Sequence, residues 1–347
     1  MHPQPEARET RLLVVDPATA QVAGRSMRDL PQLLQPGDLL VVNDAATMPA
    51  SLRAHNARGE PIELRLLGPE RDASFEAIAF GAGDYRTRTE LRPAPPELAP
   101  GEQLRVGPQL TATVVARSQL SPRWLQLRFA QRGEALWRAL YAWGTPVQYA
   151  YRPEPLALWS VQTAYAARPW ASEMPSAGRP LTVQRLLRLR ARGVRLASLT
   201  HAAGLSATGD PALDRALPLP ERYDLPQASV RAIEATRRAG GRVIAVGTSV
   251  VRALEDASLK GAGQVRAGEA TASLRITPGH RLRVVDGLLT GIHSPEESHF
   301  ELLGAFLDQA LLQRSHEHAR AYGYAEHELG DECLILRGCL AQARDAA

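Results

Sequence analysis

The chain has 347 residues, 44% of them hydrophobic and 22% charged, and its formal net charge is +4. That length is enough for one large or two unequal domains with a substantial core, and no apolar run reaches the about 18–20 residues that a membrane-spanning helix needs. The two cysteines, Cys333 and Cys339, are too few for a disulfide framework and wrongly spaced for a zinc knuckle, so we expect reduced, buried thiols.

The N-terminus passes from polar residues directly into a strand-like run, without the basic and then apolar pattern of a signal peptide. We therefore expect a cytoplasmic protein that does not enter a membrane. The sequence pI of about 9.3 permits a nucleic-acid partner without requiring one, because charge affects association and not the type of reaction.

Two apolar, β-rich runs bounded by turn residues predict strands at residues 10–16 and 37–44. Between about residues 62 and 129 the sequence changes to short alternating pieces separated by Gly, Pro and Asp, which predicts an antiparallel barrel or sandwich. The pieces are "IELRLLG", "SFEAIAFG", "TRTELRP", "QLRVG", "LTATVVA" and "WLQLRFA".

After a helix "GEALWRALYAWG" and a Pro-rich linker, helices and strands alternate, and Thr182 is expected to cap the next helix. Helices are predicted at residues 181–193, 227–241, 249–257 and 294–321, and strands at 194–200, 242–247, 271–277, 281–290 and 331–336. Such alternation is typical of a parallel sheet covered on both faces. The predicted fold is therefore α/β: a mostly parallel sheet covered by helices, with a small antiparallel β-barrel inserted. We expect the main domain at residues 1–61 and 146–347, and the barrel domain at 62–145.

The stretch "GGRVIAVGTSVVRALE" places the start of a helix directly after a buried strand. Ligands of open α/β sheets bind at such strand ends, and the free amides of a helix start attract anions. Thr248, Ser249 and Arg252 are therefore candidates for cofactor binding or fold support, although Thr248 or Ser249 can equally serve as a helix cap. A serine hydrolase is not expected, because Val251 stands where the second glycine of a nucleophile elbow belongs.

Three other strand or helix ends carry candidate residues. Asn43 and Asp44 end a strand and could bind a ribose or a base edge, or only turn the chain. Ser176 and Gly178 precede a helix in "SEMPSAGRPLT", where the backbone can approach a ligand closely, though a plain loop explains them as well. His201 follows a strand and is a candidate for proton transfer, with a structural role as the alternative.

The stretch "GIHSPEESHF" has the pattern of a helix start, with Ser294 as the cap and Pro295 at the first helical position. His293 would then precede the cap and His299 would lie inside the helix, with no third ligand evident. We therefore expect no metal at this stretch.

Several blocks occur in a recognisable order from Arg11 to Leu336: "RLLVVD", "LLQPGDLLVVND", "TPVQYAYR", "SAG", "GGRVIAVGTSVVRALE", "TPGHRLRVVDGLLTGIHSPEES" and "GDECLIL". Together they resemble the S-adenosylmethionine:tRNA ribosyltransferase-isomerase family of queuosine biosynthesis. The resemblance implies an α/β domain with an inserted β-barrel, and S-adenosylmethionine as a substrate. It also implies transfer of the ribosyl part to a 7-aminomethyl-7-deazaguanine in a tRNA anticodon, isomerisation to an epoxycyclopentane, and release of adenine and methionine.

The chain departs from the family pattern at several polar and basic positions. The family's NDTR has Ala45 and Ala46 here in place of Thr and Arg, and the arginine of its IPAR falls at Ser51. Arg179 and Pro180 replace the Leu-His pair of its PTAGLHFT, its LHVGLGTF reads "HAAGLSATG", and its HxMHxE stretch reads "RALPLPERYDLP", with only Glu221 and Tyr223 recognisable. The lysine of its NFHLPKST is replaced by Glu296, while His293, Pro295 and Ser298 are kept. Each lost basic group removes a favourable contact with an anionic partner, so the departures weaken the expectation of tRNA binding.

Three hypotheses follow from this comparison. The leading one is an enzyme that binds S-adenosylmethionine and cleaves or transfers its ribosyl part to an altered acceptor, with His293, His201 and Glu296 as proton-transfer groups. The second is the family's own reaction on tRNA. The third is a non-catalytic nucleotide-binding protein on an enzyme scaffold, because a fold does not fix a function.

Overall fold

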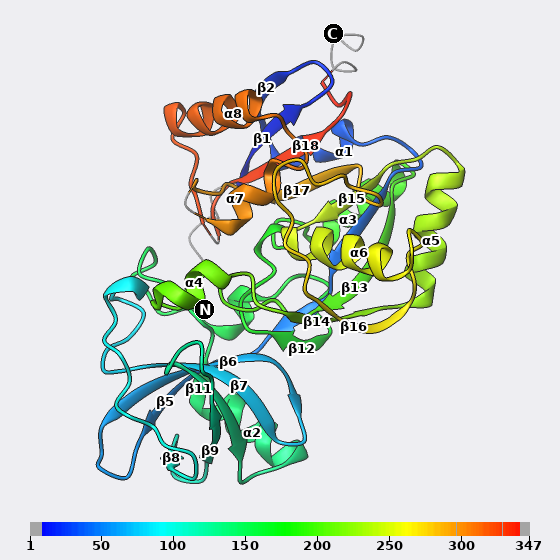
Figure 1. Cartoon of the computed structure of the whole chain (residues 1–347). Helices are drawn as coiled ribbons and strands as arrows, with labels where there is room; N and C mark the ends of the chain where they lie inside the picture. The colour runs from blue at the N-terminus through cyan, green and yellow to red at the C-terminus, as the bar shows by residue number, and fades with distance from the viewer. Residues whose placement is uncertain (1–8, 296, 328, 341–347) are drawn as a thin grey trace.

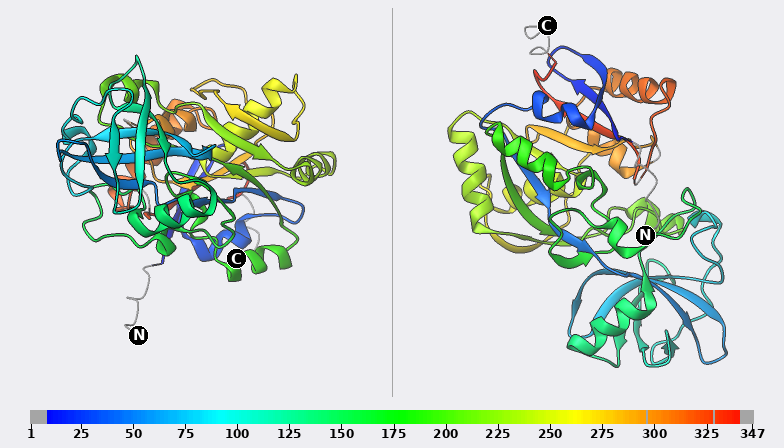
Figure 2. Two further views of the ribbon diagram at one scale, coloured as in Figure 1. Left: turned by 90° about the horizontal axis from the view of Figure 1, so that it is seen from below. Right: turned by 180° about the vertical axis from the view of Figure 1, so that it is seen from behind.

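The computed structural model describes residues 9–295, 297–327 and 329–340, so Glu296 lies outside the described residues. An α/β part built on a nine-stranded sheet adjoins a closed antiparallel β-barrel (Figures 1 and 2). Within these ranges, no helix has both the length and the apolar character needed to cross a membrane.

The large sheet has the strand order β16-β14-β13-β3-β15-β17-β18-β1-β2. Its strands are β1 (Arg11–Asp16), β2 (Gln21–Ser26), β3 (Leu39–Asn43), β13 (Arg195–His201), β14 (Glu221–Leu225), β15 (Val243–Val246), β16 (Gly268–Ala272), β17 (Gly287–Gly291) and β18 (Glu332–Leu336). The four adjacent strands β13, β3, β15 and β17 run parallel to one another. Of these strands, β3 and β15 are buried along their whole length and are the apolar runs expected of central strands.

The sheet as a whole is mixed, which corrects the prediction of a mostly parallel sheet. Strands β18 and β1 are parallel to each other, but four neighbouring pairs are antiparallel: β16 with β14, β14 with β13, β17 with β18, and β1 with β2. A parallel pair needs a long crossover over one face of the sheet. Between β13 and β14 the chain forms only the six-residue helix α4 (Pro211–Ala216), and β14 returns antiparallel.

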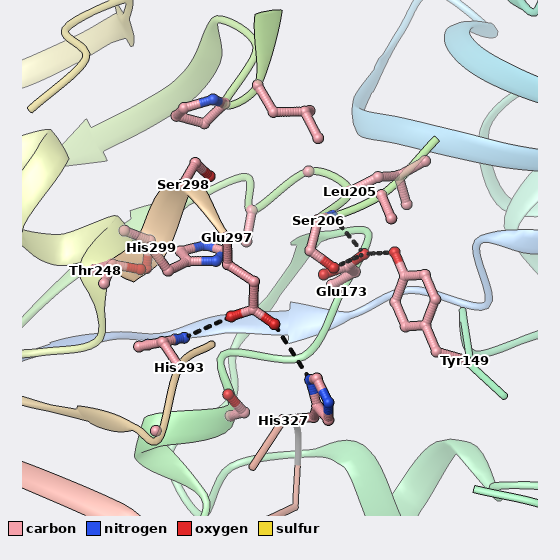
Figure 3. A pocket seen from close by; sticks show the side chains of 18 of the residues that line it. Tyr149, Glu173, Leu205, Ser206, Thr248, His293, Glu297, Ser298, His299 and His327 are labelled. Carbon is pink, nitrogen blue, oxygen red and sulfur yellow. Dashed lines mark hydrogen bonds and ion pairs between the residues drawn. The ribbon is translucent and has the colours of Figure 1, made fainter. Parts of the chain in front are cut away.

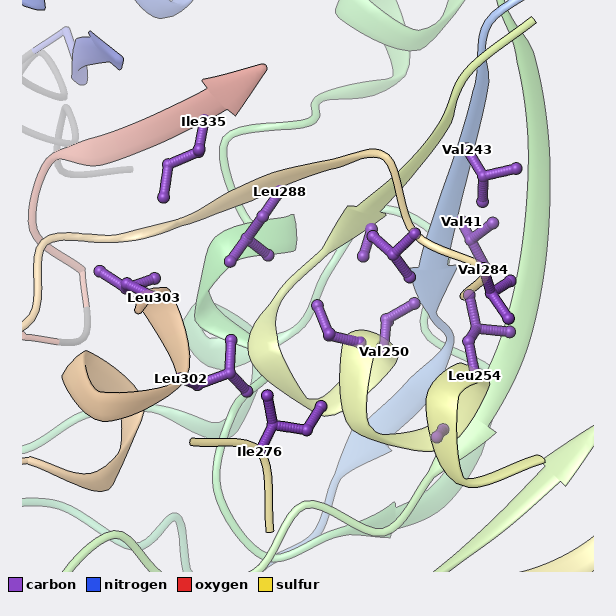
Figure 4. Packing of buried hydrophobic residues seen from close by; sticks show 14 of the residues in the cluster. Val41, Val243, Val250, Leu254, Ile276, Val284, Leu288, Leu302, Leu303 and Ile335 are labelled. Carbon is purple, nitrogen blue, oxygen red and sulfur yellow. The ribbon is translucent and has the colours of Figure 1, made fainter. Parts of the chain in front are cut away.

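Helices cover both faces of the sheet, as predicted for the α/β class. They are α1 (Leu30–Leu33), α3 (Val183–Ala191), α5 (Gln227–Arg238), α6 (Thr248–Lys260), α7 (Ser298–Leu303) and α8 (Gln309–Ala321). Along β3, Leu39 and Val41 share a core cluster with α5 and α6, while Leu40 and Val42 share another with α1 and α3. Figure 4 shows the first cluster, in which Val250 of α6 packs among residues of the sheet.

The helix predicted from Ser294 to Ala321 is in fact two helices. The first, α7, begins at Ser298 with Glu297 as its N-cap, so Ser294 and Pro295 precede it. The second, α8, begins after Asp308, whose side chain accepts a hydrogen bond from Leu311 N at 2.8 Å. An Asp cap of this kind starts a new helix, and its pattern was hidden inside the longer amphipathic run. By contrast, the predicted cap of α3 is confirmed, since Thr182 Oγ1 accepts from Arg185 N.

The barrel closes through six strands in the order β5-β6-β7-β10-β9-β8, with β8 pairing back onto β5. Its elements are β5 (Ser51–His55), β6 (Pro61–Arg71), β7 (Ser74–Phe80), β8 (Gln103–Arg105), β9 (Thr111–Arg117), β10 (Trp124–Phe129), the short β11 (Gly144–Thr145) and the helix α2 (Gly133–Trp143). The predicted inserted barrel is thus present. It includes β5, which precedes residue 62, because the change of sequence texture becomes visible only after this short strand.

The connection between β7 and β8 contains the 3-10 helix η2 (Thr89–Leu91), where the piece "TRTELRP" predicted a strand. This connection touches the α/β part at Gly209, whose φ is +67° and where a Cβ would overlap the carbonyl oxygen of Thr89. The chain segment that leads into β5 of the barrel forms a short strand, β4 (Ala45–Thr47), which pairs in parallel with β12 (Arg168–Ala171). The remaining 3-10 helices are η1 (Met27–Asp29), η3 (Leu158–Val161) and η4 (Ser176–Gly178). The division into two domains at the predicted boundaries stays a prediction.

Candidate functional site

The ends of four strands meet at one large cavity of about 1010 Å³ (Figure 3). The lining comes from residues 173–177 after β12, 203–207 after β13, 247–249 after β15, and 290–294 at the end of β17. Residues 88–90 of the barrel connection, residues 297–299 and His327 complete much of the wall. Carboxyl ends of strands are the usual ligand sites of α/β sheets, so the cavity is the candidate functional site.

The structure brings five of the predicted site residues to this cavity: Ser176, Thr248, Ser249, Arg252 and His293. Four others, Asn43, Asp44, Gly178 and His201, are not among the residues that line it. Glu296 lies outside the described residues, and its proposed role stays a prediction.

Helix α6 starts at the cavity wall. Gly247 is its N-cap with φ +93°, and no side chain caps the helix. Glycine adopts this left-handed conformation without the steric cost that other residues meet. Because neither Thr248 nor Ser249 acts as the cap, their hydroxyl groups and the first amides of α6 remain candidates for binding an anion or a carboxylate.

Arg252 lines the cavity but is almost completely occupied by structural contacts. Its guanidinium forms an ion pair with Glu221, which is on β14. It also donates to four backbone carbonyls: Leu274 at 2.8 Å, Pro218 at 3.2 Å, Leu219 at 2.7 Å and Ala272 at 2.9 Å. Among the two alternatives predicted for this residue, these contacts favour fold support over direct binding.

Asn43 joins the ends of β3 and β13. Its Nδ2 donates to the His201 carbonyl at 2.9 Å, and its Oδ1 accepts from the amides of His201 at 2.8 Å and Ala45 at 3.0 Å. His201 itself is fully buried, and burial followed by the nearby Arg252 charge lowers the pKa of its imidazole to about 3. A neutral imidazole behind the wall of the cavity fits a structural role better than proton transfer with a ligand.

Asp44, which is half-buried, and Gly178, which is buried, also contact other groups of the protein. The Asp44 carboxylate accepts hydrogen bonds from the hydroxyls of Ser198 at 2.7 Å and Thr200 at 2.5 Å, which are both on β13. Gly178 ends η4 where a Cβ would overlap the hydroxyl of Tyr165. The close backbone approach predicted at Gly178 therefore exists, but the group that it meets is a tyrosine of the same chain.

A charged network is centred on the Glu297 carboxylate (Figure 3). His293 Nδ1 lies 3.2 Å from Glu297 Oε2, and His327 Nδ1 lies 3.2 Å from Glu297 Oε1. His293 Nε2 is 2.8 Å from the Thr290 hydroxyl. Burial opposes ionisation of Glu297, but the hydrogen bonds with His293 and His327 hold its pKa well below the ordinary value. The imidazole of His299 stacks on His293, and burial and the neighbouring His293 lower its pKa to about 4.

A second carboxyl group, Glu173, was not predicted from the sequence. It accepts hydrogen bonds from the Tyr149 hydroxyl and from Ser206 N at 2.8 Å, and all three residues line the cavity. Burial raises the pKa of Glu173 in spite of these hydrogen bonds. A raised carboxyl pKa in a cavity is typical of acid–base groups. Tyr149 belongs to the block "TPVQYAYR", and Glu173 stands two residues before "PSAG", so proximity to family blocks was the available signal.

Comparison with known proteins identifies the family. The family model described as queuosine biosynthesis protein matches residues 1–335. The chain belongs to this family. The S-adenosylmethionine:tRNA ribosyltransferase-isomerase of Trichlorobacter lovleyi is 32% identical over 332 residues, which are 94% of this chain and 93% of that protein. The enzyme of the same name from Thermus thermophilus is 35% identical over 321 residues, covering 91% of this chain and 89% of that protein.

The fold of the queuosine biosynthesis family agrees with that of this chain. A crystal structure of the S-adenosylmethionine tRNA ribosyltransferase from Thermotoga maritima matches with a TM-score of 0.51 at 24% identity, over 96% of this chain and 95% of that chain. The sequence-based identification of the family, and of its combination of an α/β part with a barrel, is thus confirmed.

The departures from the family pattern lie at different places in the fold. Ala45 and Ala46 are on β4, where they pair with Arg168 and Pro169 of β12. Ser51 begins β5 and donates a hydrogen bond to Glu63 at 2.9 Å. Ala45, Ala46 and Ser51 are not among the residues that line the cavity. The retained His293 lines it, and so do residues 203–207 of the altered stretch "HAAGLSATG".

Proposed function

We propose that this chain is an S-adenosylmethionine:tRNA ribosyltransferase-isomerase that binds S-adenosylmethionine in the cavity of about 1010 Å³. The main support is that strand ends from separate family blocks, with Thr248, Ser249 and His293, converge on this one cavity. Relatives with this name match nearly the whole chain. Transfer of the ribosyl part to a tRNA base therefore has more support than the altered acceptor that the leading sequence hypothesis named.

The reaction needs a group that removes a proton made acidic by the neighbouring sulfonium, and donors that stabilise developing charge. Two groups of the cavity suit proton transfer. His293 is oriented by Thr290 and Glu297, and Glu173 is a buried carboxyl hydrogen-bonded to Tyr149. The first amides of α6, beside Thr248, suit an anionic group of the ligand, such as the carboxylate of S-adenosylmethionine.

A related reaction on another acceptor remains the second candidate. The observation that favours it is the loss of basic groups at Ala46 and Ser51 and the presence of Glu296 at the family's lysine position. Loss of positive charge weakens contact with the phosphate backbone of tRNA. The loss of these basic groups would weaken binding of the tRNA acceptor more than binding of the nucleoside donor.

One incubation separates these functions. The full chain is mixed with S-adenosylmethionine, with and without tRNA that contains 7-aminomethyl-7-deazaguanine, and small products are followed by mass spectrometry. The proposal expects adenine and methionine to appear together with a modified tRNA base. Cleavage of S-adenosylmethionine without tRNA modification would instead support the altered acceptor. Absence of S-adenosylmethionine binding in calorimetry would exclude both functions.

A further inference from the structure

Three side chains of the cavity, His293, Glu297 and His299, form a group that we call the His–Glu cluster. Their ligand atoms, two imidazole nitrogens and a carboxylate oxygen, all lie within 4.8 Å of one another. The cluster stands at the end of β17 and the start of α7, and its members line the cavity. From the sequence alone no metal is expected at this stretch, because no third ligand is evident there. The turn from Ser294 to Glu297 brings a carboxylate to the two histidines and supplies that ligand.

We propose that His293, Glu297 and His299 bind one divalent transition-metal ion of the Zn²⁺ class. Two imidazoles and one carboxylate are a known ligand set for catalytic zinc and for other first-row ions. Calcium and magnesium prefer all-oxygen sites, so they do not suit this cluster. The proposal goes beyond the proposed function and does not rest on it, and it departs from the expectation of a metal-free site. With an ion bound at Nδ1 of His293, Glu173 is the remaining candidate of the two groups named for proton transfer.

The distances within the cluster can be compared with those of a tetrahedral site. Metal–ligand bonds of about 2.0–2.2 Å place two ligand atoms about 3.4 Å apart. His293 Nδ1 and Glu297 Oε2 are 3.2 Å apart, so these two already have the required spacing. No two of the three ligand atoms are more than 4.8 Å apart. Closure of the site therefore needs the His299 nitrogen to move by about 1–1.5 Å, and the ring, which is stacked on His293, to turn so that this nitrogen points at the ion.

The surroundings of the cluster orient two of the ligands. The Thr290 hydroxyl holds Nε2 of His293 at 2.8 Å, which leaves Nδ1 directed at Glu297. His327 holds the other carboxylate oxygen, Glu297 Oε1, at 3.2 Å. Hydrogen bonds to the far side of a ligand fix its orientation and are typical of protein metal sites. They favour binding of the ion by a single oxygen of Glu297.

The test uses the full chain, treated with a chelator and then titrated with Zn²⁺ in a calorimeter, with bound zinc counted by mass spectrometry after gel filtration. We expect one zinc ion per chain. The variants His299→Ala and Glu297→Gln should each weaken binding by more than about 100-fold, since loss of a ligand costs more than the 10–100-fold typical of a lost neighbour of a ligand. The matched control is His55→Ala, an exposed histidine on β5, which should bind zinc as the unaltered chain does.

Cobalt provides a second readout that does not depend on the variants folding. Co²⁺ bound by the unaltered chain should give visible absorption bands of a four- or five-coordinate ion, and Zn²⁺ should displace it. The proposal is overturned if the unaltered chain binds less than about 0.1 ion. It is also overturned if His299→Ala and Glu297→Gln fold normally by circular dichroism and bind zinc as tightly as His55→Ala. Binding of S-adenosylmethionine in the presence of the chelator, with no zinc site, would reject this proposal while leaving the proposed function intact.

Discussion

Arg252 and Glu221 form an ion pair beside the cavity with little access to solvent, since their side chains are only 5% and 14% exposed. Burial raises the pKa of Glu221, although the Arg252 charge acts in the opposite direction. A carboxylate in such a position depends on its arginine, because an unpaired buried charge is costly.

Arg252→Met keeps much of the side-chain volume but removes the charge and the donors. We expect the free energy of unfolding to fall by about 3–5 kcal/mol, measured by urea denaturation, because Glu221 loses its counter-ion. Adding Glu221→Gln to this variant should recover part of the loss. Equal stability of the unaltered chain and Arg252→Met would contradict the structural role of this arginine.

The raised pKa of Glu173 makes the free energy of unfolding depend on pH. Glu173 faces Tyr149, Ser206, Arg65 and, at longer range, Glu221, and burial is the main reason that its pKa is raised above 4.5. A carboxyl with a higher pKa in the folded state binds more protons there than in the unfolded chain. The contribution of Glu173 to stability is therefore complete at pH values below its pKa in the unfolded chain. It is lost as the pH rises through its pKa in the folded protein.

The comparison of the unaltered chain with Glu173→Gln isolates this contribution. The free energy of unfolding of the unaltered chain, minus that of the variant, should decrease from about pH 5 to about pH 8. Chemical denaturation at the two pH values measures the difference. The matched control is Glu234→Gln on α5, which replaces an exposed carboxylate. A difference that is the same at both pH values for Glu173→Gln would refute the raised pKa.

It was easier to predict from the sequence which single residues lie at the cavity than to predict which of them contact one another. His293 and the hydroxyls of Thr248 and Ser249 could be placed at a site because they follow apolar strand runs. The convergence of His293, Glu297 and His299 could not, because the pattern "SPEE" also describes a helix start at Ser294. Because α7 begins only at Ser298, Glu297 lies in the turn before the helix. His293 and His299 are therefore placed differently from two histidines on one continuous helix.

At the scale of elements, the contact between η4 and the residues before β12 is unusually close. A Cβ on Gly178 would overlap Tyr165 Oη, and the half-buried ring of Tyr165 packs against a core cluster that limits its movement. Gly178→Ala should destabilise the protein by about 1–3 kcal/mol, as overpacking of a core does. In a Tyr165→Phe background the same change should cost clearly less, because the overlapping oxygen is gone. Thermal unfolding of the four proteins measures both steps, and equal costs in the two backgrounds would contradict this contact.

The strands of the sheet were largely predictable, and the connections were not. Runs such as "LLVVN" and "VIAV" are apolar on both faces, which is typical of buried central strands. Whether the next strand pairs parallel or antiparallel depends on the path between them, and a short helix such as α4 leaves no local signature of that path. The break between α7 and α8 was missed for a similar reason, since the cap residue Asp308 lies within an otherwise amphipathic run.

For the whole molecule, the cavity joins the barrel to the α/β part. Residues 88–90 belong to a barrel connection, whereas residues 203–207 and 247–249 belong to the α/β part, and all contribute to the wall. A ligand that fills the cavity stabilises every segment that it contacts. With S-adenosylmethionine, hydrogen–deuterium exchange should slow in all three segments and stay unchanged in α2, which does not line the cavity. Protection limited to the α/β segments would show that the barrel takes no part in binding.

The backbone contact between Gly209 and Thr89 has an evolutionary consequence. It sets how closely the barrel connection approaches the sheet, and the same connection supplies part of the cavity wall. The strand ends that carry Thr248 and His293 lie on a separate framework. A change in length between β7 and β8 would therefore reshape this part of the cavity wall without disturbing those strand ends. The fold thus allows selection to alter one side of the cavity while the strand ends that carry Thr248 and His293 are inherited unchanged.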